Sequence, residues 1–215
     1  MNISDFEFEY AIYLYDNYGV ITTHLNDGDV FIDIGANTAL LSKKIYDTTN
    51  LNKIYLIEPV PYLVDECKRK FENCENVEIH QLAFSNQNKE EIMYVSHWNL
   101  GYNKIYKEGM EIHSHNKLNV MCVTFSQWVI KNNITKIDFI KIDAEGHDIE
   151  IIEGMFDWLN SNENKPFILF EGNWYFDKEQ DLIKKMKSIY DYEFEVFGRD
   201  VLLKPPNKKI NKNII

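Results

Sequence analysis

Four acidic residues stand at the ends of short apolar segments that the sequence predicts to be strands: Asp33, Glu58, Asp143 and Glu171. The carboxyl ends of parallel strands meet at one edge of a sheet, where α/β proteins bind their ligands. Carboxylates at that edge favour a cationic ligand over a phosphate, and they can accept a proton or bind a metal ion. The sequence therefore predicts a negatively charged site.

The turn after the first of these segments indicates which ligand the site binds. A dinucleotide site normally has Gly-x-Gly-x-x-Gly without a carboxylate beside it. Here Gly35, Ala36 and Asn37 include one glycine, and Asp33 precedes it by two residues. S-adenosylmethionine, which carries an ammonium and a sulfonium, suits this arrangement: Gly35 would let its methionine end approach the backbone, and Glu58 would accept hydrogen bonds from both ribose hydroxyls. A helix-capping role for Asp33 and a surface position for Glu58 are the alternatives.

The segment Ala-Glu-Gly-His-Asp directly follows Asp143. A hydroxyl group that accepts a methyl group is a poor nucleophile and benefits from a general base or a metal ion. We expect Asp143, Glu145 and His147 to face such an acceptor, with Asp143 or His147 as the catalytic base. The alternative for His147 is an exposed position in the first turn of a helix.

Oxygen ligands for a metal ion are available at the same edge. Asp143 and Glu171 end neighbouring predicted strands, and Asn173 follows closely. Three such ligands could bind Mg²⁺, and the set is similar to that of catechol-type O-methyltransferases. The alternative is that Glu171 orients the substrate.

Between Ser96 and Asn119 the sequence has no regular period and is rich in aromatic residues and histidine. Long segments of this kind are often functional loops. We expect residues 96–119 to be a substrate-loop insertion that supplies His97, Trp98 and Tyr102, with Trp98 or Trp174 stacking on a sugar. The alternative is a solvent-exposed loop whose aromatic residues cover the domain.

The elements that must position these residues alternate between strands and helices. Strands are expected at 30–34, 53–58, 76–83, 91–95, 120–124, 136–143 and 167–170, with an antiparallel pair at 192–196 and 201–203. Helices are expected at 2–19, 38–45, 61–71, 126–131, 149–159 and 182–189, from their apolar spacing. This alternation predicts a doubly wound, mostly parallel sheet.

Length and composition limit the classes of protein. The 215 residues suit one domain, which we place at 1–204, followed by a flexible tail at 205–215. The net charge of −11 argues against a nucleic-acid partner, because such proteins usually have a basic face. No apolar stretch approaches the roughly 20 residues of a membrane span. We expect a cytoplasmic monomer or homodimer, in the host cytoplasm if the source is a virus.

Three motifs, in the right order, resemble those of the FkbM-type methyltransferases, which use S-adenosylmethionine. They are Phe31–Asn37, Ile57–Pro59 and Asp138–Gly146, and Phe170–Glu171 follows the next predicted strand. Many methyltransferases share the first motif, whereas the string Lys-Ile-Asp-x-Glu-Gly is much more specific. Ala144 and the pair His147-Asp148 depart from the usual family residues.

The resemblance implies a Rossmann-like class I methyltransferase fold: α/β, with a mostly parallel seven-stranded sheet and helices on both faces. It implies O-methylation of a sugar, a glycan or a similar small hydroxylated acceptor, with S-adenosylmethionine as cofactor. The candidate cofactor-binding residues are Asp33, Gly35, Ala36, Asn37, Glu58, Ala83, Phe84 and Asp143. The competing functions are a nicotinamide-dependent oxidoreductase and a cofactor-binding module without turnover.

Overall fold

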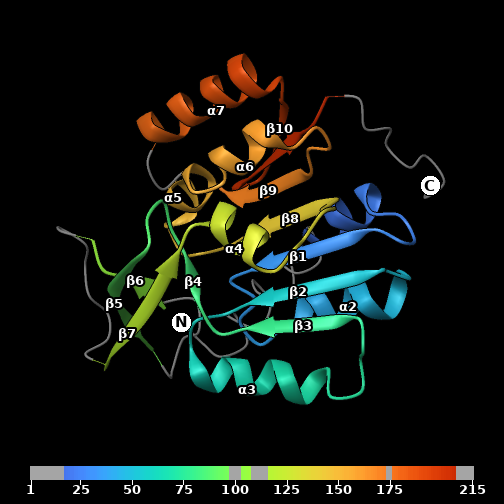
Figure 1. Ribbon diagram of the computed structural model, residues 1–215, viewed down its shortest axis with the longest axis vertical. Helices are drawn as coiled ribbons and strands as arrows, with labels where there is room; N and C mark the ends of the chain where they lie inside the picture. The colour runs from blue at the N-terminus through green and yellow to red at the C-terminus, as the bar shows by residue number, and fades with distance from the viewer. Residues whose placement is uncertain (1–16, 97–102, 108–115, 173–175, 207–215) are drawn as a thin grey trace.

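The computed structural model describes residues 17–96, 103–107, 116–172 and 176–206. In this part of the chain, seven strands form one sheet in the order β10-β11-β9-β8-β1-β2-β3 (Figure 1). The parallel strands are β1 (Val30–Ile34), β2 (Lys53–Ile57), β3 (Val77–His80), β8 (Phe139–Ile142) and β9 (Phe167–Glu171), and the antiparallel ones are β10 (Glu193–Phe197) and β11 (Asp200–Lys204). The predicted mostly parallel seven-stranded sheet is confirmed.

The central strand β1 is buried along its whole length, because β2 and β8 pair with its edges and helices cover both faces of the sheet. The chain adds β2 and β3 on one side of β1 and then returns to add β8 and β9 on the other. The strand order therefore reverses between β1 and β8, and a crevice opens beyond their carboxyl ends.

Helices cover both faces of the sheet (Figure 1). One face carries α2 (Leu40–Thr48), α3 (Pro61–Lys70) and the helical residues 17–24, and the other carries α4 (Phe125–Lys131), α5 (Asp148–Glu153), α6 (Phe156–Ser161) and α7 (Phe176–Tyr190). In two of these helices, the first residues explain why the helix begins there. Pro61 opens α3, where its missing N–H has no intrahelical partner to lose, and Thr124 Oγ1 accepts the Gln127 N–H at the start of α4 (3.3 Å).

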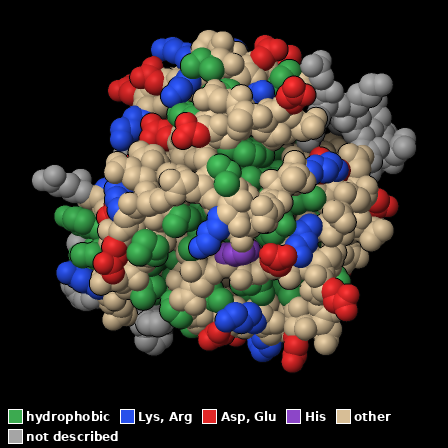
Figure 2. Space-filling view, in the orientation of Figure 1, with side chains coloured by type: hydrophobic (Ala, Val, Ile, Leu, Met, Phe, Trp, Pro, Cys, Tyr) green, Lys and Arg blue, Asp and Glu red, His purple; other side chains and the backbone are tan. Residues whose placement is uncertain are grey.

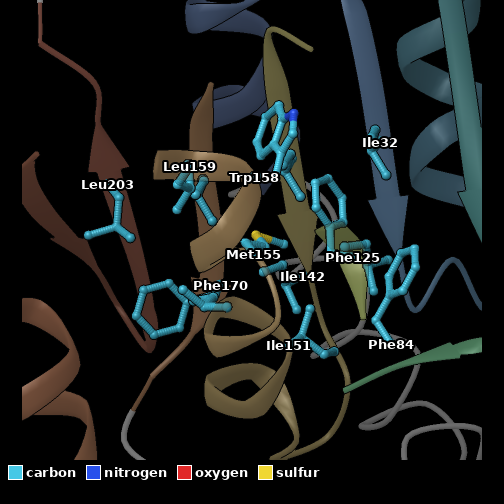
Figure 3. Packing of buried hydrophobic residues seen from close by; sticks show 14 of the residues in the cluster. Ile32, Phe84, Phe125, Ile142, Ile151, Met155, Trp158, Leu159, Phe170 and Leu203 are labelled. Atoms are coloured by element: carbon cyan, nitrogen blue, oxygen red, sulfur yellow. The ribbon is translucent and has the colours of Figure 1, made fainter. Parts of the chain in front are cut away.

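A hydrophobic core lies on each face of the main sheet, because side chains alternate along its strands. In β1, Ile32 packs toward the face covered by α4 to α7, whereas Phe31 packs toward α2 and α3. Figure 3 shows Met155 lying between Ile142 of β8 and Phe170 of β9 in the first of these cores.

The N-terminal helical residues contact the strands that come last in the chain. Asn17 Nδ2 donates a hydrogen bond to Asp200 Oδ2 of β11 (3.0 Å), and the rings of His24 and Phe167 pack with centroids 4.7 Å apart. The helix that we predicted over 2–19 lies mostly outside the described residues, as does most of the tail predicted at 205–215.

A second sheet of four strands stands beside the main sheet, in the order β4-β7-β5-β6. Its strands are β4 (Ala83–Phe84), β5 (Lys89–Val95), β6 (Lys104–Ile105) and β7 (Asn116–Val123). We expected an irregular segment over 96–119, but within it β6 and the first residues of β7 are regular. The reason is a ladder that pairs all seven residues of β5 with β7, burying Met93 and Val120 on one face.

The apolar stripe predicted as one helix over 149–159 forms two short helices, α5 and α6. The chain changes direction at Gly154, where an added Cβ would lie 2.2 Å from the carbonyl oxygen of Ser85. The Gly154 carbonyl also accepts hydrogen bonds from the Ser126 N–H (3.1 Å) and hydroxyl (2.8 Å). The helix is therefore interrupted at Gly154, where the backbone packs closely against Ser85 and Ser126.

The outer face of the second sheet is partly apolar. Met121 is 59% exposed and Ile92 is 40% exposed. Figure 2 shows hydrophobic side chains over this part of the surface, with charged side chains between them. None of the described helices combines the length and the apolar character that crossing a bilayer requires.

Replacing Gly154 by alanine should destabilise the fold by about 2–3 kcal/mol, because the new Cβ overlaps the Ser85 carbonyl. Urea unfolding measures this change. Gly19→Ala is the control, since no atom lies within 4 Å of a Cβ at that helical position, and it should be neutral or slightly stabilising. Equal stability of the two variants would contradict the packing described.

Candidate active site

A cavity opens at the carboxyl ends of β1, β2 and β8, and the second sheet forms one of its walls. Its empty space is about 610 Å³, a figure that includes volume open to solvent. Most of its lining is apolar. The polar side chains that line it are Asn37, Glu58, Asn103, Asp143, Glu145 and His147.

A buried ion-pair network lies directly behind this cavity. Lys141 Nζ of β8 is 3.1 Å from Asp33 Oδ1, 3.5 Å from Asp143 Oδ2 and 3.5 Å from the carbonyl oxygen of Gly35. The Ser42 hydroxyl of α2 donates to the other oxygen of Asp33 (2.6 Å). The side chains of Lys141 and Asp33 are 5% and 1% exposed, so the network joins β1, β8 and the Gly35 turn away from water.

Gly35 is required by the packing of the backbone itself. Its φ is +74°, and an added Cβ would lie 1.9 Å from the carbonyl oxygen of Asp143. The N–H groups of Gly35 and Ala36 both donate to the Ile57 carbonyl (3.0 and 3.1 Å), which fixes the turn against β2. The sequence suggested a role for this glycine toward the cofactor, and the structure adds the contact with Asp143.

Glu58 is positioned at the end of β2 by two backbone donors. Asn37 N donates to Oε2 and Val60 N donates to Oε1, both at 2.9 Å. Burial raises the pKa of Glu58 to about 7, against the effect of these hydrogen bonds. Each oxygen retains a second lone pair, so the carboxylate can accept further hydrogen bonds from a ligand.

The loop between β8 and α5 is held by a buried carboxyl group. Asp148 accepts hydrogen bonds from Ala144 N (3.4 Å) and Gly146 N (3.1 Å). Burial raises the pKa of Asp148 to about 7. These bonds fix the loop that carries Glu145.

Glu145 has the most strongly raised pKa among these acids, at about 8. The causes are burial first and then the charges of Asp143 and Glu171, while Lys104 opposes the increase. Glu145 has a left-handed backbone (φ +52°), and its side chain is 24% exposed. It therefore combines access to the cavity with unusual basicity for a carboxylate.

His147 is buried rather than exposed, so the alternative position considered from the sequence is wrong. Its Nε2 lies 3.0 Å from the Ser85 hydroxyl, and its Nδ1 lies 3.9 Å from Glu150 Oε2. Burial lowers the pKa of His147 to about 4, so the ring is neutral at pH 7. A group with so low a pKa accepts a proton weakly.

Residues 103–107 of the second sheet contact the loop after β8. Lys104 Nζ is 3.6 Å from Glu145 Oε2, and Lys107 Nζ donates to the Gly146 carbonyl and to Glu150 Oε1, both at 2.8 Å. Asn103 lines the cavity. We did not single out these residues from the sequence, because their positions depend on the two-residue strand β6, which gives no period to detect.

The structure brings most predicted site residues to this one cavity: Gly35, Asn37, Glu58, Ala83, Phe84, Asp143, Glu145 and His147. Asp33 and Ala36 are not among the residues that line it. Asp33 points toward α2, because side chains alternate along β1 and Ile34 takes the cavity side. Glu171 lies in a smaller neighbouring hollow, 3.3 Å from Arg199. The remaining substrate candidates, His97, Trp98, Tyr102 and Trp174, lie outside the described residues.

The structure does not support the predicted Mg²⁺ site. Among the described residues, no group of three or more His, Cys, Asp or Glu side chains is arranged to bind a metal ion. Asp143 Oδ2 lies 3.5 Å from Lys141 Nζ, and Glu171 Oε1 lies 3.3 Å from Arg199 Nη1. Asn173, the third predicted ligand, lies outside the described residues.

Comparison with known protein families identifies the chain. The family described as "Methyltransferase FkbM domain" matches residues 33–199, which include the Gly35 turn, Glu58 and the loop after β8. The chain belongs to the FkbM methyltransferase family. Membership implies S-adenosylmethionine as the methyl donor and weighs against a nicotinamide-dependent oxidoreductase. A comparison with curated proteins finds no match.

Several solved structures with the same fold are described as methyltransferases. The FkbM methyltransferase from Methylobacillus flagellatus KT is 14% identical, with a TM-score of 0.56 over 83% of this chain and 44% of that chain. Precorrin-6y C5,15-methyltransferase from Geobacter metallireducens GS-15 is 13% identical (TM-score 0.50; 90% and 84% covered), and the METTL16 MTase domain is 8% identical (0.51; 92% and 67%). These likenesses show a shared class I methyltransferase fold. The FkbM-family chain described here spans less than half of the M. flagellatus protein.

Removing the buried lysine of this FkbM-family chain should be costly. Lys141→Met leaves Asp33 charged and without its cation, and should lower the free energy of unfolding by about 3–5 kcal/mol. Lys136→Met is the matched control, because the Lys136 side chain is 53% exposed and its ion pairs contribute about 1 kcal/mol or less. Similar urea midpoints for both variants would contradict a buried network.

The stability of the unliganded protein should fall as the pH rises from about 4.5 to 8. Glu58, Glu145 and Asp148 have pKa values of about 7, 8 and 7 in the fold, above the values near 4 of an unfolded chain. The folded state therefore binds more protons in this range, and the stability this provides is lost as the pH rises through the folded pKa values. Urea unfolding at several pH values measures the slope, and Glu58→Gln should reduce it. Stability that rises with pH would overturn this assignment.

Proposed function

We propose that this FkbM-family chain transfers the methyl group of S-adenosylmethionine to a hydroxyl oxygen of a sugar, a glycan or a similar small hydroxylated compound. The observation that carries the proposal is Glu145, a carboxyl group with a pKa of about 8 in the same cavity as Glu58 and Asp143. One group suited to remove a proton thus lies beside two groups suited to bind the donor.

The residues of the cavity fit S-adenosylmethionine, which when bound supplies an electrophilic methyl group on a sulfonium. Glu58 would accept the ribose hydroxyls with the lone pairs that its backbone donors leave unused. Asp143, beside the Gly35 turn and 21% exposed, would bind the ammonium group. The acids of the cavity together favour a cationic ligand.

Glu145 is the proposed general base. A base acts best when its pKa is close to the working pH, and a carboxylate with a pKa of about 8 is both a strong acceptor and about half ionised at pH 8. Of the two bases expected from the sequence, His147 has too low a pKa for this role, and Asp143 is assigned to the donor. Lys104, 3.6 Å away, stabilises the ionised form of Glu145.

A small uncharged acceptor suits the electrostatics of the chain better than a nucleic acid does. The net charge is −11, and three carboxyl groups line the cavity. The negative net charge repels a phosphate backbone. A neutral hydroxylated compound meets no such repulsion.

The decisive test of the function has two parts. S-adenosylhomocysteine should raise the melting temperature of the protein, and NAD should not. Mass spectrometry of glycans should then reveal a sugar that gains the mass of a methyl group with the active protein but not with Glu145→Gln. Ligand binding without any methylated product would favour the cofactor-binding module, and activity that chelator abolishes would restore the Mg²⁺ hypothesis.

The pH dependence of catalysis should report Glu145. With the base ionised above its pKa, kcat/KM for the methyl donor should rise with pH and level off above about pH 8. Lys104→Met should shift the rise of kcat/KM to higher pH, because Lys104 lowers the pKa of Glu145. Glu145→Gln should lower kcat by about 100-fold or more.

Glu90→Gln is the control for these variants. Glu90 is an exposed acid on β5, so its loss changes the net charge by the same amount without touching the cavity. The pH dependence of kcat/KM for Glu90→Gln should match that of the parent protein. A Glu145→Gln enzyme with unaltered kcat would exclude Glu145 as the base.

A further inference from the structure

Besides Nδ1 of His147, one side-chain polar atom of the residues that line the cavity has no hydrogen-bond partner among the described residues. It is the buried side-chain amide nitrogen, Nδ2, of Asn103, the residue directly before β6. A buried N–H group without a partner is destabilising, and native structures rarely retain one without a reason. Because Asn103 lines the cavity, a ligand bound there can supply the missing acceptor.

The other end of this amide fixes its orientation. Asn103 Oδ1 accepts the backbone N–H of Ser96 at 2.8 Å, so Nδ2 is the end available to a ligand. Tyr62 is a polar neighbour: its hydroxyl donates to the Ser96 carbonyl (3.3 Å), and the Asn103 amide opposes the increase in the Tyr62 pKa that burial causes. Tyr62 is therefore the competing partner that an experiment must exclude.

The part of the cavity near Asn103 is apolar. Leu63 of α3 packs with Ala83, Met93 and Ile105 in one cluster, and all four also line the cavity. Glu58 lies at the same end, because its Oε1 accepts the N–H of Val60, one helical turn before Leu63. An apolar wall with one amide donor, next to a carboxylate that suits a ribose, has the chemistry of a nucleobase site.

We propose that Asn103 Nδ2 donates a hydrogen bond to a ring nitrogen of the adenine of the methyl donor, so that the second sheet recognises the base. This inference rests on the proposed function. Adenine suits the site, because N1, N3 and N7 of its ring are hydrogen-bond acceptors and its faces are apolar enough for the cluster around Leu63 and Met93.

Calorimetric titration with S-adenosylhomocysteine and its 1-deaza, 3-deaza and 7-deaza analogues tests the proposal. Each analogue replaces one ring nitrogen by a C–H group. The parent protein should bind one analogue about tenfold or more weakly than S-adenosylhomocysteine. Asn103→Asp keeps the acceptor for Ser96 N but replaces the donor, so it should bind S-adenosylhomocysteine about tenfold or more weakly and lose that discrimination.

Two further variants separate this effect from others. Asn119→Asp places the same new charge at an exposed position of β7 and should bind like the parent. Tyr62→Phe should retain the discrimination among the analogues. If Tyr62→Phe instead abolishes it, or if the parent binds all three analogues as well as S-adenosylhomocysteine, the inference is wrong. Failure of the parent to bind S-adenosylhomocysteine at all would overturn the proposed function as well.

Discussion

The site depends on one buried interaction, the contact of Lys141 with Asp33. A buried ion pair costs desolvation energy and is not in itself a reason for stability, so its value here lies in geometry. The same ammonium group reaches Asp33 on β1, Asp143 at the end of β8 and the carbonyl of Gly35. Without it, three negatively polarised groups would face one another at the point where the strand order reverses.

Three acids at the cavity or in the loop behind it differ in their partners. Glu58 accepts two backbone hydrogen bonds, Glu145 has a lysine at 3.6 Å, and Asp148 binds the loop from behind. Burial raises the pKa of all three. The unliganded site therefore holds protons near pH 7.

Much of the main sheet could be predicted from the sequence, because each of its central strands is a short apolar run that ends near an acid. Glu58 and Asp143 were predicted at the crevice for this reason, and both line the cavity. The pairing of Asp33 with Lys141 could not be predicted, since it joins residues 108 positions apart. The sequence predicted that Asp33 contacts the cofactor, whereas in the structure Asp33 contacts Lys141 and Ser42 behind the Gly35 turn.

The second sheet was predicted only in part: the expected strands at 91–95 and 120–124 correspond to β5 and β7, but β6 and a separate sheet were not expected. β4 and β6 have two residues each, and too short a strand shows no period. The pKa of Glu145 is raised by burial and by the charges of Asp143 and Glu171, and Lys104 of this sheet opposes the increase, so it could not be obtained from the local motif alone. The local sequence pattern predicted the positions of the acids, whereas their pKa values depend on contacts between residues that are far apart in the sequence.

The contact of Asn17 with Asp200 has a consequence for how the chain folds. It joins residues 183 positions apart, and His24 likewise packs on Phe167 of β9. During synthesis, the N-terminal helical residues leave the ribosome long before the strands that cover them. Folding is therefore completed only after β11 has been made, and contacts this distant in sequence slow the search for the native state.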